Sequence, residues 1–278
     1  MKHSIATIAP LCLLFAGLNF TAPASAQQET SEHTAPPKVL EIITETLKPG
    51  QSGSPHVKTE AAFVQAMRSA QSPEHYIGLD ALTGSSRAVF LLAYDSFAGF
   101  QKDLDDTRKN ASLTNAMDQA SIADGELLSR YQTSIYTFRD DLSFNPGAQI
   151  GSIRYFEITL FHVRSGHARD WDALVKMYRA AMQKVPGAHW DTFEKRYGDN
   201  SGNTFIVVTP MKSLSEVDVE MSNHQKLSTL MSSEDIQKFM ALDESTIDSV
   251  VSNLFAINPK MSYAADAWTK ADPKFWGQ

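Results

Sequence analysis

Tyr155-Phe156-Glu157-Ile158, continuing to Val163-Arg164-Ser165-Gly166, is the stretch that decides the fold, because the chain contains a similar stretch earlier. The earlier copy is Val39-Leu40-Glu41-Ile42, continuing to Leu47-Lys48-Pro49-Gly50. Both are typical of a β-strand that ends in a glycine-containing turn. A repeat at so long a separation predicts two similar structural units in one chain.

A helical pattern follows each of these turns. Apolar residues recur at spacings of three and four, which places them on one face of a helix. In the second copy these residues are Trp171, Leu174, Val175, Tyr178, Met182 and Val185, and in the first they are Phe63, Ala66, Met67 and Ala70. Each helix therefore needs an apolar surface, such as a sheet, to cover.

The same order of elements then continues in both copies. A second strand opens at His75-Tyr76 or His189-Trp190, and a third strand, an N-capped helix, a longer helical stretch and a last strand follow. Ser96 and Ser213 are the expected N-caps. In the second copy the apolar stripe of the longer helix is expected to run from Ile236 to Leu254, opened by Ser232 or Ser233. The order βαββαβ is that of the ferredoxin-like unit.

The turn at Leu47-Lys48-Pro49-Gly50, and the third strand running into Tyr94-Asp95-Ser96-Phe97, resemble the dimeric α/β-barrel superfamily, most closely its NIPSNAP-type and uncharacterised secreted members. The resemblance covers nearly all of residues 38–276. It implies an α+β fold in which two ferredoxin-like βαββαβ units of one chain pack sheet against sheet as an α/β barrel. A physical argument agrees, because one sheet with helices on a single face leaves its other face bare.

The N-terminus predicts export. Lys2, an apolar run from Ile5 to Phe20 and the small residues Ala24-Ser25-Ala26 have the order of a cleavable signal peptide, residues 1–26. The run is shorter than the roughly 20 residues that cross a bilayer, so we expect no membrane anchor. We expect a linker at 27–37, a first unit at 38–147, a second at 148–278, and a periplasmic or extracellular location.

Composition excludes several classes of function. The chain has 25 Lys and Arg against 32 Asp and Glu residues, a net charge of −7, which disfavours nucleic acid as a partner. Its single cysteine, Cys12, lies inside the predicted signal peptide. The mature chain is therefore expected to have neither disulfides nor thiolate chemistry.

Side chains alternate along a strand, so the first strand of each copy divides into two faces. We expect the more apolar set to face the helices: Leu40, Ile42, Phe156, Ile158 and Leu160. The other set, which the resemblance implies points into the barrel, comprises Val39, Glu41, Ile43, Glu45, Tyr155, Glu157, Thr159 and Phe161.

Three residues are candidate catalytic groups. Glu41 and Glu157 hold matching positions, and a carboxylate desolvated between sheets has a raised pKa and can act as a general base. The competing interpretation places both at the barrel mouth, solvated or paired with Arg or Lys. His189, which matches His75, is a candidate acid, base, metal ligand or haem ligand; its alternative is a surface histidine whose aromatic neighbour fills the core.

No motif supports a metal or a cofactor. The chain lacks His-Glu-x-x-His and a third ligand at metal-like spacing. The Asn, Trp and His of haem-degrading members of the superfamily cannot be placed together here, so haem has no supporting motif. Trp171, Tyr178, Phe239 and Phe255 are interpreted as core residues.

Three hypotheses of function follow. The first is a binding protein that holds a small apolar or aromatic ligand in the inter-sheet cavity, with Tyr76, Tyr155 and Trp190 near its mouth. The alternative is a cofactor-independent monooxygenase, an isomerase or a haem-related enzyme of the dimeric α/β-barrel type, with Glu41 or Glu157 as the base. The third is a structural or stress-related protein without a ligand that acts through its surface or by self-association.

Overall fold

The computed structural model describes residues 35–200, 202–225 and 227–277. The predicted signal peptide, residues 1–26, and residues 27–34 of the predicted linker lie outside the described residues. Within the described ranges, no helix combines the length and the apolar character that a bilayer span requires.

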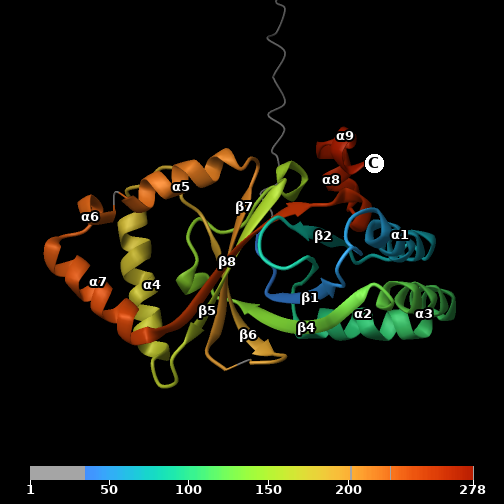
Figure 1. Cartoon of the computed structure of the whole chain (residues 1–278), viewed down its shortest axis with the longest axis horizontal. Helices are drawn as coiled ribbons and strands as arrows, with labels where there is room; N and C mark the ends of the chain where they lie inside the picture. The colour runs from blue at the N-terminus through green and yellow to red at the C-terminus, as the bar shows by residue number, and fades with distance from the viewer. Residues whose placement is uncertain (1–34, 201, 226, 278) are drawn as a thin grey trace, which may run out of the picture. The chain divides into compact units, whose positions relative to one another are not determined.

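The strands close into an antiparallel barrel in the order β1-β3-β2-β8-β5-β7-β6-β4 (Figure 1). Their bounds are β1 Val39–Leu47, β2 Tyr76–Ala81, β3 Arg87–Tyr94, β4 Leu128–Phe138, β5 Tyr155–Val163, β6 Asp191–Tyr197, β7 Thr204–Met211 and β8 Ile247–Ile257. The chain therefore has an α+β fold built on a closed sheet.

Helices cover the outside of this barrel on two sides (Figure 1). On the first side lie α1 Ser54–Ser69, α2 Phe97–Lys109 and α3 Ala111–Gly125. On the second lie α4 Ala168–Met182, α5 Ser215–Gln225, α6 Leu227–Leu230 and α7 Ser233–Thr246. The remaining short elements are η1 Asp140–Leu142, η2 Ile150–Ser152, η3 Pro259–Met261, α8 Asp266–Ala271 and α9 Pro273–Trp276.

The strand order repeats in the two halves of the chain. The first half contributes β4-β1-β3-β2 and the second contributes β8-β5-β7-β6, so β1 and β5 hold equivalent central positions. The halves join through β2–β8 and β4–β6, two shorter pairings. The predicted boundary between residues 147 and 148 falls in the connection from β4 to β5.

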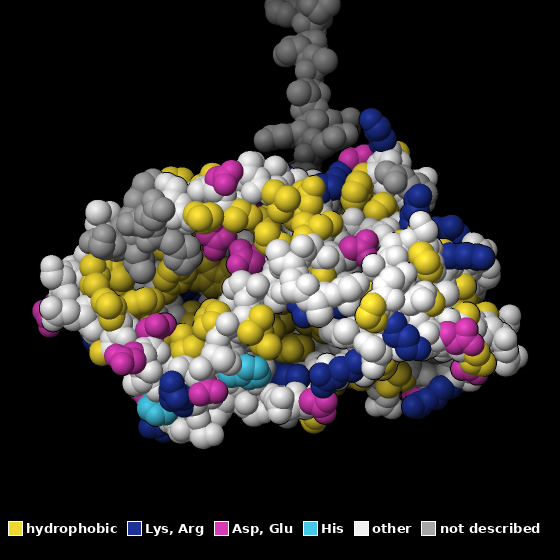
Figure 2. All heavy atoms as spheres, in the orientation of Figure 1, with side chains coloured by type: hydrophobic (Ala, Val, Ile, Leu, Met, Phe, Trp, Pro, Cys, Tyr) yellow, Lys and Arg dark blue, Asp and Glu magenta, His cyan; other side chains and the backbone are white. Residues whose placement is uncertain are grey.

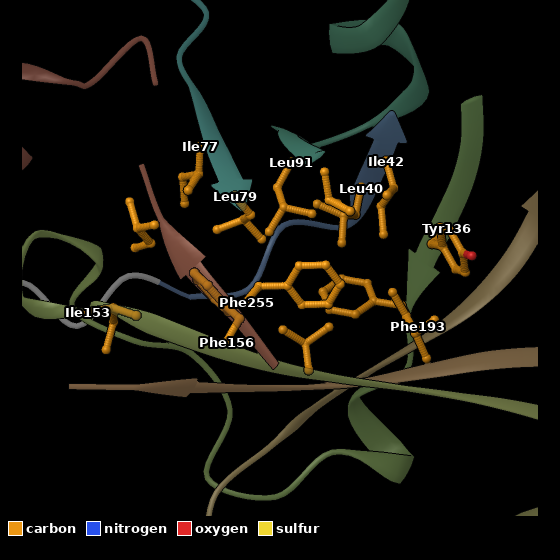
Figure 3. Packing of buried hydrophobic residues seen from close by; sticks show 14 of the residues in the cluster. Leu40, Ile42, Ile77, Leu79, Leu91, Tyr136, Ile153, Phe156, Phe193 and Phe255 are labelled. Carbon is orange, nitrogen blue, oxygen red and sulfur yellow. The ribbon is translucent and has the colours of Figure 1, made fainter. Parts of the chain in front are cut away.

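The interior of the barrel is a packed apolar core. Figure 3 shows side chains from β1, β2 and β3 meeting side chains from β5, β6 and β8. The buried members of this core are Leu40, Ile42, Ile77, Leu79, Val89, Leu91, Tyr136, Ile153, Phe156, Phe193, Ile206, Val208, Phe255, Ile257 and Trp276.

The prediction of which strand face lies under the helices is therefore wrong. Leu40, Ile42 and Phe156 are buried inside the barrel, and Ile158 and Leu160 pack against the same core. Glu41 and Glu157 lie on the opposite face. Alternation fixes which residues share a face, but not which face is the drier one. A closed barrel excludes water more completely than a helical layer does, so it takes the more apolar set.

A second correction concerns the stripe expected to run as a helix from Ile236 to Leu254. Helix α7 ends at Thr246, and the residues that follow, Ile247–Ile257, form β8. The N-caps Ser96 and Ser232 are confirmed, because their side chains accept hydrogen bonds from the backbone N–H of Gly99 and Asp235.

The C-terminal helices close one end of the barrel. The Trp276 side chain belongs to the barrel core, and its indole N–H donates to the carbonyl of Gly151 at 3.0 Å. Arg154 pairs with Asp272 and stacks over the ring of Phe275 at 3.9 Å from its centroid. These contacts hold α8 and α9 against the start of β5.

Gly78→Ala tests how tightly strand β2 packs against η3. A Cβ at Gly78 would lie 2.5 Å from the backbone oxygen of Met261, a fully buried residue. We expect the substitution to lower the free energy of unfolding by about 1–3 kcal/mol, measured by urea denaturation. Gly125→Ala is the control, because its Cβ would meet nothing within 4 Å. Equal stability of the two variants would contradict the close packing.

Candidate functional site

A cavity of about 550 Å³ lies between the outer face of the second half of the barrel and the helices that cover it. Figure 2 shows a hollow on this side of the molecule, with hydrophobic side chains inside it and acidic side chains nearby. The expected inter-sheet location of the ligand cavity is wrong, because apolar side chains fill the space between the sheets. Of the residues expected to line a cavity, Glu157, Thr159 and Phe161 line this one, but they do so under helices.

The floor of the cavity is formed by the outward side chains of β5, β7 and β8. Alternation places every second residue of these strands on this face. They are Glu157, Thr159 and Phe161 on β5, Val207, Thr209 and Met211 on β7, and Val250 and Ser252 on β8. The floor therefore mixes apolar groups with hydroxyls and one carboxylate.

The roof comes from three helices and one loop. The apolar stripe of α4 points at the sheet, and its Trp171 ring packs on Phe161 at 5.0 Å between centroids. Helix α5 adds polar groups and α7 closes the far side. The lining residues of the roof are Trp171, Leu174, Val175, Tyr178, Met182, Glu216, Val219, Glu220, Asn223, Phe239 and Asp243, with 186–190 from the loop before β6.

The structure brings together three of the six residues singled out from the sequence. Glu157, His189 and Trp190 all line the cavity. Trp190 is fixed there, because its indole N–H donates to the carbonyl of Leu142 at 2.9 Å and its ring lies 5.4 Å from that of Tyr178. Their roles in binding or catalysis stay predictions.

The other three residues lie elsewhere. Glu41 is on the helical side of β1, in the first half, and Tyr76 is buried among residues of α1, α3 and β3. Tyr155 is half-buried at the start of β5 and does not line the cavity. The matching positions of Glu41 and Glu157 thus have different surroundings, because the cavity of about 550 Å³ lies against β5 and not against β1.

Negative charge dominates the polar part of the cavity. Burial raises the pKa of Tyr178, and the charges of Glu220 and Glu157 raise it further, so the phenol stays protonated at neutral pH. Glu157 accepts a hydrogen bond from the hydroxyl of Thr159 at 3.4 Å. Glu216 is engaged at the start of α5, where its carboxylate accepts from the backbone N–H of Lys212 at 2.8 Å.

Both ring nitrogens of His189 are engaged by the backbone. Nδ1 lies 2.9 Å from the carbonyl oxygen of Gly187, and Nε2 lies 2.8 Å from that of Pro210. Both partners are acceptors, so a neutral imidazole can satisfy only one of them. His189 therefore holds the loop before β6 against β7, and neither nitrogen points freely into the cavity.

The residues present do not suit haem. Of the described side chains that line the cavity, His189 is the only imidazole, and its nitrogens are already bonded. No Lys or Arg is found in the described lining, whereas Glu157, Glu216, Glu220 and Asp243 are. The two propionates of haem would face these carboxylates without a cation. The cavity favours a neutral or cationic ligand instead.

No protein-family model matches the chain, and no curated protein matches it. Solved structures do match. A proposed monooxygenase from Fusobacterium nucleatum subsp. nucleatum ATCC 25586 is similar with a TM-score of 0.52 and 8% identity, over 81% of this chain and 94% of that chain. The likeness concerns the overall fold, which in this chain is a closed antiparallel barrel.

Two further structures show lower similarity. An anthrone oxidase-like protein has a TM-score of 0.49 and 12% identity, over 80% of this chain and 92% of that chain. The chlorite dismutase from Candidatus Nitrospira defluvii, in complex with imidazole, has a TM-score of 0.46 and 9% identity, over 84% of this chain and 95% of that chain. At such identities the likeness concerns the fold alone.

Sequence reasoning missed Glu220 and assigned Tyr178 to the core. Tyr178 does lie on the apolar stripe of α4, and periodicity cannot show that the stripe covers a hollow. Glu220 could have been noticed, because it follows Glu216 by four residues and shares its helix face. The interpretation of Phe255 as a core residue is confirmed, since its side chain is buried inside the barrel.

Glu41→Gln tests the electrostatics of the first half. Burial and the charge of Asp103 raise the pKa of Glu41 from 4.5 to about 7, against a hydrogen bond from Tyr94 that lowers it. The folded protein keeps this proton where the unfolded chain has lost it, so the wild-type protein loses stability as the pH rises from 4.5 to about 7.

The variant has no such titration. The free energy of unfolding of the variant minus that of the wild-type protein should therefore rise by about 2 kcal/mol between pH 4.5 and pH 8. This is less than the whole pKa shift would give, because the Glu41 side chain is partly exposed to solvent. Urea denaturation across this pH range measures the difference. A constant difference would show that Glu41 titrates normally.

Proposed function

We propose that the protein is an enzyme that oxidises a small, neutral aromatic molecule with O₂ in the cavity of the second half, without a bound cofactor. The observation that carries this proposal is an apolar cavity of about 550 Å³ with the carboxylate of Glu157 on its floor. An apolar cavity with a few placed polar groups is the usual form of a small-molecule site. The dimeric α/β-barrel fold, shared with a proposed monooxygenase, supports the same choice.

The chemistry needs a base and an oxidisable substrate. Glu157 takes a proton from a carbon or oxygen whose anion is stabilised by an aromatic ring. The anion gives one electron to O₂, the two radicals combine, and a hydroperoxide forms. Loss of water then leaves a carbonyl, so that R₂CH₂ and O₂ become R₂C=O and H₂O. The substrate itself is the reductant.

The surroundings of Glu157 fit this role. Thr159 donates a hydrogen bond to its carboxylate, which orients the base. The aromatic rings of Trp171 and Trp190 supply flat apolar surfaces for the substrate. Tyr178, whose pKa is raised, keeps its proton and can supply it to the oxygen that leaves as water.

Other features of the chain enter this proposal from the sequence. We propose that the two halves arose by tandem duplication, which the repeated element order and the equivalent places of Glu41 and Glu157 support. We also propose a closer resemblance to NIPSNAP-type proteins. We further propose that the protein is exported from the cytoplasm with removal of residues 1–26, and that it self-associates.

Anthrone is a suitable probe, because its acidic CH₂ lies between two aromatic rings and its product, anthraquinone, is easily measured. We expect the wild-type protein to accelerate O₂ uptake with anthrone. Glu157→Gln should lower kcat by about 100-fold or more, since general base catalysis contributes 10²–10⁴-fold. The substrate should still quench the fluorescence of Trp171 and Trp190.

Glu41→Gln is the matched control, because it removes a carboxylate from the equivalent strand position outside the cavity. It should keep wild-type activity. Fluorescence quenching without O₂ uptake would contradict the proposed oxidation and would indicate a protein that only binds its ligand. An absorption band of haem in protein purified from its own host would show that the cavity takes the cofactor after all.

A further inference from the structure

Four ionisable side chains meet inside the first half, far in the fold from the cavity of the second. Glu45 comes from β1, His56 and Glu60 from α1, and Asp124 from α3. His56 Nε2 lies 3.0 Å from Glu45 Oε2, 3.6 Å from Asp124 Oδ1 and 3.8 Å from Glu60 Oε1. One donor atom from each of the four lies within 4.8 Å of all the others.

The cluster is sealed from solvent. The exposed fractions are 5% for Glu45, 1% for His56, 3% for Glu60 and 2% for Asp124. Within the described part of the chain, no Lys or Arg forms an ion pair with any of them. Three carboxyl groups therefore share one imidazole in a low-dielectric environment, where an uncompensated charge is very unfavourable.

Two polar atoms at this place have no hydrogen-bond partner. Glu60 Oε1 is buried and directed at the cluster, yet nothing donates to it. The hydroxyl of Tyr76 is also buried without a partner, and the charges of Glu60 and Glu45 act on it. Buried polar atoms in proteins are nearly always bonded, so this arrangement points to a missing ligand.

The fold does not need polar groups here. Glu45 is the seventh residue of β1, and the seventh residue of β5 is Phe161. In the second half, Phe161 meets Trp171 of the following helix ring to ring. The same junction between strand and helix can thus be closed by aromatic side chains, and the polar set in the first half requires another explanation.

We propose that Glu45, His56, Glu60 and Asp124 bind one divalent transition-metal ion of the Mn²⁺ or Fe²⁺ type. Metal–ligand bonds of about 2.0–2.2 Å place neighbouring donor atoms roughly 3–4 Å apart, as the atoms around His56 Nε2 are. Carboxylate oxygens favour Mn²⁺, and a single imidazole extends the choice to Fe²⁺ and Zn²⁺.

The surroundings are those of a structural metal centre. Thr59 donates a hydrogen bond to Asp124 at 2.6 Å, which orients this ligand as outer hydrogen bonds commonly do in metal sites. The ion would tie β1, α1 and α3 together. The cavity of about 550 Å³ is lined by residues of the second half, so the ion would stabilise the first half and take no part in the oxidation proposed for the second.

Without a cation, protons would have to neutralise the cluster. Burial raises the pKa of Glu60 to about 10, and the charges of Glu45 and Asp124 add to this. Protonation is the competing explanation for the four buried groups. It differs from metal binding in one measurable respect, because a protonated cluster gains nothing from added metal.

The test uses the full mature chain without a histidine tag, refolded in chelator and then titrated with Mn²⁺. The electron paramagnetic resonance signal of free Mn²⁺ measures binding, and thermal unfolding measures its effect. We expect one Mn²⁺ per chain and a rise in Tm of about 5 °C at a hundredfold excess over Kd. Glu60→Gln and His56→Gln should weaken binding by roughly 100-fold or more.

Glu41→Gln is the control, because it removes a carboxylate from the same face of β1 outside the cluster, and it should bind Mn²⁺ normally. If the cluster variants do not fold, the wild-type titration and its reversal by chelator decide the question. Absence of Mn²⁺ and Zn²⁺ binding by the wild-type protein would overturn the proposal. So would unchanged binding by Glu60→Gln, or a Tm that added metal leaves unchanged.

Discussion

Burial of one apolar strand face inside a closed barrel is the constraint on which the rest of the structure depends. Leu79, Phe156 and Phe255 are almost completely inaccessible, and neither half of the sheet could bury them alone. Because side chains alternate, closing the barrel turns every other residue of each strand outward. That outward face must be covered by helices, and both the cavity and the buried polar cluster lie on it.

Much of the fold could be predicted, because its information is local. The alternation at Val39–Leu47 and Tyr155–Val163, the stripe of α4 and the caps Ser96 and Ser232 are short-range patterns. The end of α7 could not be placed, since the residues after Thr246 continue an apolar pattern and only strand pairing with β5 selects the extended form. The prediction of which strand face lies under the helices failed for a similar reason, because that choice depends on what the whole sheet packs against.

The candidate site was predictable in part. Repetition of the strand pointed to Glu157, and the aromatic at the next strand pointed to Trp190, and both line the cavity. The same argument chose Glu41 and Tyr76, which do not, because a repeat cannot show which copy is hollow. The buried cluster escaped notice, since Glu45 and Asp124 are 79 positions apart in the sequence and meet only when α3 packs beside α1.

Both halves of the barrel belong to one polypeptide, and this removes a restriction that two identical chains would impose. In a symmetric dimer every substitution appears twice, at equivalent places. Here Glu45 and Phe161 occupy equivalent strand positions and differ completely in chemistry. The asymmetry lets a cavity in the second half coexist with a buried polar cluster in the first. The seams β2–β8 and β4–β6 also form within the chain, so closing the barrel does not depend on protein concentration.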